Sequence, residues 1–304
     1  MHRIGIIHKH SEPRALEATA LLVRWLNRRG CEVSVAEEGI PPEYQQLPPC
    51  CLTPQDLLPE GQDLVVVLGG DGTFIAASRS VGDRDTPLLG INMGRLGFLT
   101  EVPYEEMLVA IEHVLHGRGH LEERMQLEVM VRRENDTPLT CHVLNDAVIH
   151  KGRLARMIDF EVSIDNQFVF SSRADGLIVS TPSGSTAYAL SAGGPIVHPA
   201  LEAILLVPIC PHALSNRPIV VPGQGTVTIG VVEDGLDRLL TLDGQSGFPL
   251  EPGDMVEIRR SPHRLKVIHP PQRNYYAVLR DKLRWGERVG RQPEPLNRTD
   301  YGRS

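Results

Sequence analysis

The chain has 304 residues, of which 41% are hydrophobic and 23% are charged, and its formal net charge at pH 7 is −7. This length predicts roughly two domains with a sizeable core, and the composition excludes a wholly disordered chain. A general nucleic-acid binder needs a basic field, which this acidic chain lacks, and no apolar run approaches the ~20 residues of a membrane span. We therefore expect neither nucleic acid nor a membrane as a partner.

The cysteines and the N-terminus point to a cytoplasmic protein. There are five cysteines, an odd number, and their spacing matches neither a zinc site nor a disulfide framework. The first residues of the chain hold too few apolar side chains for a signal peptide.

The first 120 residues alternate between predicted strands and helices. Residues 3–8 and 31–36 are predicted strands on either side of a helix over 12–29, and Gly30 follows it where a glycine commonly ends a helix. Residues 63–68 are a continuous apolar run, typical of a strand that is buried on both faces of a parallel sheet. The further predicted elements are a helix from Phe74 to about Ser80, a strand over 87–91, a helix over 103–117 and a loop over 39–61.

After about residue 120, strand-like segments dominate. They cover residues 125–133, 139–150, 158–164, 167–170, 176–180, 218–221, 226–231, 238–242 and 255–260, with a hairpin turn predicted at Asp165-Asn166. Residues 275–285 predict a helix. We therefore expect an α/β domain with a Rossmann-like open sheet over 1–120, a β-rich domain over 121–274, and a C-terminal helix with a polar tail over 275–304.

The most informative local feature is a strand that runs into Gly69-Gly70-Asp71-Gly72-Thr73 and then a helix. Ligands gather at the carboxyl ends of strands in open α/β sheets, and a helix start offers N–H groups and a positive dipole end to phosphate. Asp71 beside a phosphate suits one of two tasks, holding a divalent cation or accepting a proton from an attacking hydroxyl. The alternative interpretation is a tight turn with Asp71 as the N-cap of the helix.

A second informative segment spans residues 174–195, where a strand ends in small hydroxyl residues and glycines that lead into a short helix. Such a stretch builds a polar concavity of backbone N–H and hydroxyl groups that suits phosphate or sugar. The alternative is a flexible Ser/Gly loop, but the strand before it and the helix after it argue against flexibility.

These two segments together resemble the NAD kinase family. Residues 69–73 match its phosphate-binding motif, and residues 175–195 resemble its long glycine-rich motif. Residues 144–149 resemble its Asn-Glu motif, with Asp146 where many members have glutamate, and residues 208–218 match a stretch typical of bacterial members. The loop Asp243-Gly244-Gln245 resembles a family loop near the nucleotide, so the resemblance spans roughly residues 3–285.

The resemblance implies an activity and a set of site residues. The reaction would transfer the γ-phosphoryl group of ATP to the 2′-hydroxyl of the adenosine ribose of NAD, with a divalent cation, expected to be Mg²⁺, on the ATP phosphates. Asp71 would be the general base, and Gly72 would allow close approach of the ligand. The other implied binding residues are Asn145 and Asp146 at the adenosine, Asp175 at the nicotinamide end, Thr186, Ala187, Tyr188, Ala189, Leu190 and Ser191 around NAD, Arg156 and Arg173 near ligand phosphate, and Gln245 as a polar contact.

The resemblance also implies the architecture and the assembly. The ligand would lie between an N-terminal α/β domain and a C-terminal β-rich domain, and the C-terminal helix would return to the first domain. Homodimers or homotetramers are expected, with sites near the subunit interface. No protein ligands for the metal are implied.

Two other functions are compatible with parts of the sequence. Lipid kinases share the Gly-Gly-Asp-Gly core, but no basic amphipathic helix or lipidation motif is evident here. A catalytically silent NAD or NADP sensor on the same fold is the other alternative, and the intact Asp71 disfavours it. Acceptance of NADH and the choice between ATP and polyphosphate as donor stay open.

Overall fold

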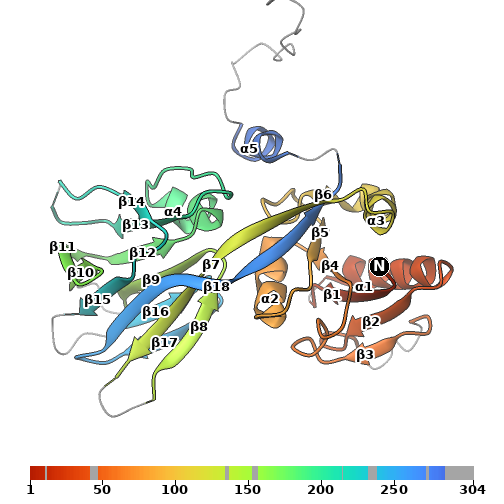
Figure 1. Cartoon of the computed structure of the whole chain (residues 1–304), viewed down its shortest axis with the longest axis horizontal. Helices are drawn as coiled ribbons and strands as arrows, with labels where there is room; N and C mark the ends of the chain where they lie inside the picture. Colours follow the sequence, from red (N-terminus) through yellow and green to blue (C-terminus); the bar gives the residue numbers. More distant parts are fainter. Residues whose placement is uncertain are drawn as a thin grey trace, which may run out of the picture.

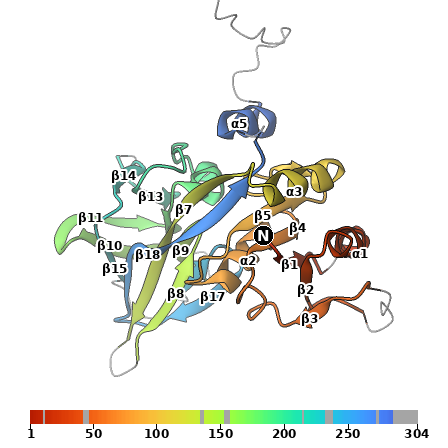
Figure 2. The same cartoon turned by 45° about the vertical axis from the view of Figure 1, so that its right-hand side comes forward.

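The computed structural model describes residues 1–10, 12–41, 47–133, 137–152, 157–213, 215–231, 238–271 and 274–284. Figures 1 and 2 show two parts side by side, one with alternating strands and helices and one made of sheets, joined by a pair of long strands.

The N-terminal part is a parallel sheet with helices on both faces. It contains β1 (Arg3–His8), α1 (Pro13–Asn27), β2 (Glu32–Ala36), β3 (Cys51–Thr53), β4 (Leu64–Gly69), α2 (Asp71–Val81), β5 (Leu88–Asn92), β6 (Val102–Pro103), the 3-10 turn η1 (Tyr104–Glu106) and α3 (Met107–Leu115). The strand order is β5-β4-β1-β2-β3, and α1 and α3 pack on one face while α2 packs on the other. The predicted alternation of strands and helices is confirmed, whereas the short strands β3 and β6 were not predicted.

Two neighbouring strands of this sheet, β1 and β4, connect in opposite directions. The chain runs from β1 through α1 to β2 on one side, and from β4 through α2 to β5 on the other. The register places His8 beside Leu68 at the carboxyl ends of the two strands. Such a reversal leaves a crevice at this edge, which is where open α/β sheets bind ligands.

The C-terminal part consists of two sheets that share a core. Its elements are β7 (His120–Arg132), β8 (Leu139–Val143), β9 (Asp146–Lys151), β10 (Ile158–Ile164), β11 (Gln167–Ala174), β12 (Gly176–Ser180), η2 (Ser183–Thr186), α4 (Tyr188–Ser191), β13 (Ala203–Ile209), β14 (Ile219–Pro222), β15 (Val227–Val231), β16 (Arg238–Leu242), β17 (Ser246–Leu250) and β18 (Met255–His269). One sheet has the order β14-β13-β12-β9-β16-β17, and the other follows β11-β10-β15-β18. Side chains such as Phe160 and Val256 from one sheet and Leu177 from the other meet in a single apolar core.

The strands β7 and β18 join the two parts. They pair antiparallel along most of their length, and β18 continues into the N-terminal sheet, where Val267 pairs with Leu88 of β5. Figure 1 shows this ribbon crossing from one part to the other. One sheet therefore runs through both parts.

The structure departs from the sequence-based expectations at several strands. The predicted strand over 139–150 is two strands, β8 and β9, because the chain turns at Leu144 and Asn145. The strand β18 is longer than the predicted 255–260, since a register shift between Arg260 and Arg264 interrupts its apolar alternation. The strands β13 and β17 were missed, whereas the predicted turn at Asp165-Asn166 is confirmed by φ values of 48° and 63°.

The predicted C-terminal helix is present as α5 (Tyr275–Leu283). Asn274 caps it by accepting a hydrogen bond from the Ala277 N–H at 2.9 Å. The Lys282 ammonium lies 5.2 Å from the centre of the Phe98 ring in the N-terminal part, and the Tyr275 ring lies 4.7 Å from that of His198 in the C-terminal part. The helix thus contacts both parts, while the limits drawn at residues 120 and 274 stay predictions.

Among the described helices, none combines the length and the apolar character that crossing a membrane requires.

Candidate functional site

The predicted phosphate loop lies at the end of β4, where α2 begins. Gly69 ends the strand, Gly70 is the N-cap, and Asp71 is the first residue of the helix. Gly70 offers no side chain to cap α2, and Asp71 does not cap it either. The alternative in which Asp71 is a structural N-cap is therefore wrong.

The Asp71 carboxylate is held by the loop that follows β5. Its Oδ2 accepts a hydrogen bond from the Phe98 N–H at 2.9 Å. Its Oδ1 accepts three, from the Leu99 N–H at 3.0 Å and from the N–H and the hydroxyl of Thr100, both at 3.1 Å. An ionised carboxylate has about four acceptor positions shared by two oxygens. Oδ2 is therefore the oxygen with capacity left to accept a substrate hydroxyl.

Close packing explains the glycine at position 97 of this loop. A Cβ on Gly97 would overlap the Asp71 Oδ1 and the Thr100 hydroxyl oxygen. By contrast, a Cβ on Gly94 of the same loop would meet no atom within 4 Å. The loop can therefore approach the Asp71 carboxylate this closely only because residue 97 has no side chain.

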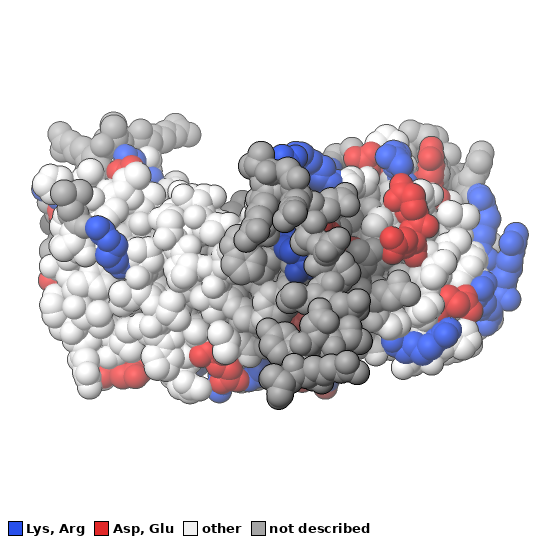
Figure 3. Space-filling model, turned by 90° about the horizontal axis from the view of Figure 1, so that it is seen from above, with Lys and Arg blue, Asp and Glu red and all other residues white. Residues whose placement is uncertain are grey.

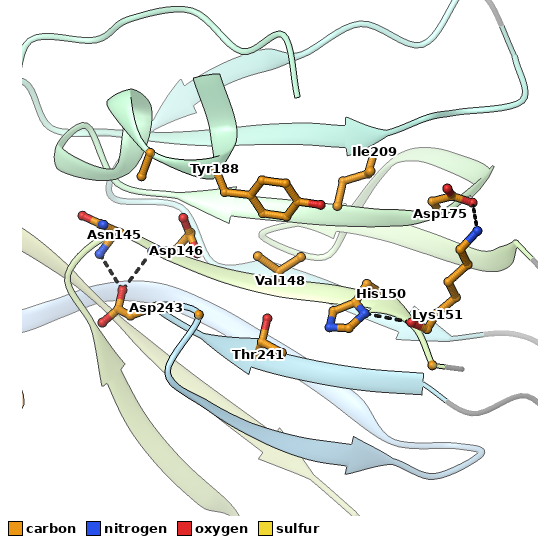
Figure 4. A pocket seen from close by; sticks show the side chains of 13 residues that line it. Asn145, Asp146, Val148, His150, Lys151, Asp175, Tyr188, Ile209, Thr241 and Asp243 are labelled. Atoms are coloured by element: carbon orange, nitrogen blue, oxygen red, sulfur yellow. Dashed lines mark hydrogen bonds and ion pairs between the residues drawn. The ribbon is translucent and has the colours of Figure 1, made fainter. Parts of the chain in front are cut away.

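A pocket of about 460 Å³ opens on the six-stranded sheet, beside the start of α4. Figure 4 shows Tyr188 across its top and the side chains of β9 and β16 along its floor. Its lining residues are Asn145, Asp146, Val148, His150, Lys151, Gly152, Asp175, Ala187, Tyr188, Ile209, Thr241, Asp243 and Gly244. Five predicted binding residues, Asn145, Asp146, Asp175, Ala187 and Tyr188, are brought together here.

Two buried carboxylates lie at one end of this pocket. Asp243 accepts hydrogen bonds from the N–H groups of Leu144, Asn145 and Asp146 at 3.1, 2.7 and 3.2 Å, which ties the Asn-Asp turn to the loop after β16. Burial raises the pKa of Asp243 despite these bonds. Burial also raises the pKa of Asp146 to about 7, and the charge of Asp243 adds to this rise. Asp146 therefore titrates near neutrality at this end of the pocket.

The raised pKa of Asp146 predicts a pH dependence of stability. The unfolded carboxyl ionises near 3.8 and the folded one near 7, so the folded state binds more protons in this window. Its contribution to stability is full below the unfolded pKa and is lost as the pH rises through the folded pKa. We expect the fall in Tm between pH 5 and pH 8 to be smaller in Asp146→Asn than in wild type, by about 2 °C or more in calorimetry.

The matched control for that measurement is Asp159→Asn. Asp159 is a half-buried carboxylate on β10 that lies 3.8 Å from Arg173 and outside the pocket. Its variant should keep the wild-type difference in Tm between the two pH values. Equal falls in Tm for Asp146→Asn and wild type would contradict the prediction.

An ion pair closes the other end of the pocket. The Lys151 ammonium lies 2.7 Å from the Asp175 carboxylate, and the Lys151 N–H donates to the Asp175 carbonyl at 3.1 Å. Both side chains are partly exposed to the pocket, as Figure 4 shows. Asp175 therefore offers a carboxylate that is oriented by a cation and still open to a hydroxyl or amide donor.

Gln245 connects this pocket to the start of α2. Its side-chain N–H donates to the Gly72 carbonyl at 2.7 Å, and its side-chain oxygen accepts from Arg79 at 2.5 Å. Arg79 also lies 3.9 Å from the Asp243 carboxylate. Gln245 follows the lining residue Gly244, so it links this end of the pocket to the residue after Asp71.

The glycine-rich block folds against the pocket as an ordered turn, so the flexible-loop alternative is wrong. The Thr181 hydroxyl donates to the Leu144 carbonyl at 2.6 Å, and the Ser185 hydroxyl donates to the Pro182 carbonyl at 2.6 Å and accepts from the Val197 N–H at 3.0 Å. These hydroxyls hold the block together, and the expectation that they line the concavity is wrong for both. The residues of this block that line the pocket are Ala187 and Tyr188.

The remaining predicted residues lie around the pocket or outside it. Ala189 is fully buried in an apolar cluster with Val148 and Ile178. Arg173 is on β11, half-exposed and away from the pocket lining. Thr186, Leu190 and Ser191 belong to η2 and α4 but do not line the pocket, and Arg156 lies outside the described residues.

Several residues of the site were not predicted from the sequence. Residues 98–100, which hold Asp71, come 27 to 29 positions after it in the chain. Their one available signal was their position after a predicted strand, since loops at that edge of a parallel sheet meet. No motif in the sequence around Lys151 or Arg79 indicated that either residue belongs to the site.

The residues that the structure describes contain no group of three or more His, Cys, Asp or Glu side chains arranged to hold a metal ion. A divalent cation that is held mainly by substrate phosphates and water fits this site, because Mg²⁺ commonly keeps several waters and binds substrate oxygens.

Comparisons with known proteins all match NAD kinases. The family models of the ATP-NAD kinase N-terminal domain and the ATP-NAD kinase C-terminal domain match residues 4–119 and 144–270. An NAD kinase of Magnetococcus marinus is 54% identical over 290 residues, which cover 95% of this chain and 96% of that protein. An NAD kinase of Geotalea daltonii is 46% identical over 289 residues, which cover 95% of this chain and all of that protein.

Two solved structures share the fold. Yeast NADH kinase complexed with NADH matches with a TM-score of 0.85 at 26% identity, over 95% of this chain and 89% of that one. An NAD kinase from Archaeoglobus fulgidus in complex with ATP matches with a TM-score of 0.72 at 27% identity, over 92% of this chain and 99% of that one. Together with the site geometry and the match of both domain models, these similarities show that the chain belongs to the NAD kinase family.

Proposed function

We propose that this protein transfers the γ-phosphoryl group of ATP to the 2′-hydroxyl of the adenosine ribose of NAD, giving NADP and ADP. The observation that carries the proposal is the position of Asp71. Asp71 is the first residue of α2, and the carbonyl of the next residue, Gly72, accepts a hydrogen bond from Gln245, which follows the pocket residue Gly244.

Asp71 acts as the general base through Oδ2. The 2′-oxygen forms a new bond to the γ-phosphorus, the bond from that phosphorus to the bridging oxygen of ADP breaks, and the hydroxyl proton passes to Oδ2. Phosphoryl transfer has a loose transition state, so positioning and charge neutralisation matter more than the strength of the base. The four hydrogen bonds to Asp71 hold it for this purpose, and the N-terminus of α2 favours the phosphate charge.

The pocket on the six-stranded sheet holds NAD. Asn145 and Asp146 contact the adenosine, Asp175 contacts the nicotinamide end or its ribose, and Tyr188 offers a flat surface. Gln245 supplies a polar contact next to Gly72. The complex of yeast NADH kinase with NADH supports a dinucleotide ligand on this fold.

The other binding roles are assigned by resemblance alone. Residues 186, 187, 190 and 191 contact the dinucleotide, whereas the fully buried Ala189 supports them by packing in the apolar cluster. Arg156 and Arg173 meet ligand phosphate or the ligand of a neighbouring subunit. A divalent cation, Mg²⁺ by expectation, bridges the ATP phosphates and neutralises charge on them.

We also propose assembly into a homodimer or homotetramer in the cytoplasm. Viewed from above, the end of the molecule that carries α4 and β14 shows few charged side chains (Figure 3). Val220 on the edge strand β14 and Leu201 before β13 are about half exposed, which suits a subunit contact. The five cysteines are all free thiols, as is usual in a reducing compartment. Light scattering on purified protein tests the assembly.

The test of the reaction is the formation of NADP from ATP, Mg²⁺ and NAD, detected with an NADP-specific dehydrogenase. NADP formation is the expected result. Binding of NAD without turnover would favour the sensor alternative. If the protein neither bound NAD nor formed NADP, lipid substrates would be tested next.

A further inference from the structure

The loop that holds Asp71 is itself tied to the end of β18. Thr100, whose N–H and hydroxyl donate to the Asp71 carboxylate, is followed directly by Glu101. The Glu101 carboxylate lies 3.3 Å from the Nδ1 atom of His269, the last residue of β18. Both side chains are buried, so water screens this contact little. The support of Asp71 therefore extends beyond its own loop to the ribbon that joins the two parts of the molecule, which Figure 1 shows reaching β5.

The series of contacts continues from His269 into the C-terminal part. The Nε2 atom of His269 lies 3.0 Å from the Glu122 carboxylate on β7. Glu122 in turn pairs with Arg124 at 3.1 Å, and the Arg124 guanidinium donates to the Ser183 hydroxyl at 3.4 Å. Ser183 begins η2, in the glycine-rich block that supplies part of the pocket lining. Buried charges of alternating sign thus connect the Asp71 loop to the block beside the NAD pocket.

The position of His269 between two carboxylates favours its charged form. Burial opposes the charge, but Glu101 and Glu122 outweigh burial and raise the pKa of His269 to about 9, while Arg124 acts to lower it. A protonated imidazole carries an N–H at each ring nitrogen, which matches one carboxylate on each side. His269 also lines a pocket of about 320 Å³, whose other titratable side chains besides the two glutamates are His120, His198, Tyr275 and Tyr276. No further carboxylate of the described residues lines that pocket.

We propose that His269 is a positioning residue for phosphoryl transfer: by pairing with both Glu101 and Glu122, it fixes residues 98–100, and through them the Asp71 carboxylate, relative to the glycine-rich block. The catalytic consequence rests on the proposed function. Among the residues that the structure describes, His269 is the only ion-pair partner of Glu101. Without it a buried carboxylate would lose its counter-charge, which is strongly unfavourable, so the chain next to Thr100 would move to expose it to water.

Three variants and one control test this role. His269→Gln removes the charge and keeps an amide donor, Glu101→Gln removes the carboxylate charge at nearly constant size, and the double variant carries both changes. The control is His142→Gln, which changes the histidine of another pair, 3.7 Å from Glu128, on β8 and outside the lining of the NAD pocket. We would measure kcat and KM in the NADP assay, and hydrogen–deuterium exchange at the amides of residues 98–100.

We expect kcat at pH 7 to fall about tenfold in each single variant, less than the ~10²-fold loss that a displacement of about 1 Å can cause. Because both residues act through one contact, the double variant should also lose about tenfold and not about a hundredfold. The KM for NAD should stay within about twofold of wild type, since neither residue lines the NAD pocket. The amides of residues 98–100 should exchange faster in all three variants, and His142→Gln should match wild type throughout.

The pH profile of kcat supplies a measurement that a purely structural role would not change. In wild type, His269 loses its proton as the pH rises through about 9, so its pairing with both carboxylates is lost in that range. His269→Gln has no such proton to lose. The ratio of wild-type to variant kcat should therefore decrease from about tenfold at pH 7 towards one at about pH 10.

The outcomes separate this role from the reaction itself. Unchanged kcat and unchanged exchange at residues 98–100 in both single variants, with NADP still formed, would overturn the positioning role and leave the proposed reaction intact. Losses that multiply in the double variant would also overturn it, because the two residues would then act separately. If wild type formed no NADP but the variants still exchanged faster at residues 98–100, the anchoring of the loop would stand and the proposed reaction would fall. Glu101→Gln tests the role even if the His269 variants fail to fold.

Discussion

Replacing Asp71 with asparagine is expected to lower kcat for NADP formation about 10²- to 10⁴-fold, the usual contribution of a general base. The variant amide cannot accept the 2′-hydroxyl proton. Its N–H₂ group also conflicts with one of the N–H donors at Phe98, Leu99 or Thr100, because an amide has one acceptor oxygen where the carboxylate has two. The measurement is steady-state NADP formation, with NAD binding followed separately by calorimetry.

We expect kcat to fall far more than the affinity for NAD, because other residues line the pocket that we propose for NAD. A matched control is Asp63→Asn, which changes another carboxylate that accepts backbone N–H groups, those of His2 and Arg3, and that does not line the pocket on the six-stranded sheet. That variant should keep kcat within about twofold of wild type. Near-normal turnover in Asp71→Asn would remove the base assignment and leave the family membership untouched.

The second large effect is expected at Gly97, which touches no substrate in this proposal. In Gly97→Ala the new Cβ would overlap the Asp71 Oδ1, so either the carboxylate or the loop must move. Misplacement of a catalytic group by about 1 Å can lower a rate about 10²-fold. We therefore expect kcat to fall by about that factor, with a smaller change in the KM for NAD.

Gly94→Ala is the matched control for this prediction, since a Cβ there meets no atom within 4 Å in the same loop. Its kcat should stay near that of wild type. If Gly97→Ala and Gly94→Ala had the same kcat, the loop would not be positioning Asp71. Thermal unfolding of both variants separates a local effect on the carboxylate from a general loss of stability.

Asp71→Asn and Gly97→Ala test the same structural relationship, in which the proposed base, Asp71, is supplied by one βα loop and is oriented by the next. The strands β4 and β5 are neighbours in a parallel sheet, so their carboxyl ends bring the two loops together. The carboxyl end of β1 lies beside that of β4 on its other side.

The sequence by itself determined the local elements and the chemistry that short motifs carry. The run over residues 64–69 followed by Asp71 required a buried strand, a tight turn and a helix start, and these depend on residues that are neighbours in the chain. The glycine-rich block and the Asn-Asp turn were recognisable for the same reason. Together these motifs correctly indicated the NAD kinase family.

Only the tertiary structure decided which groups complete that site. Asp243 binds the N–H of Leu144 from 99 positions away, and Gln245 binds Gly72 from 173 positions away. Hydrogen bonds and burial at these points arise from strand order and register, which follow from packing across the whole chain and leave no local pattern in the sequence.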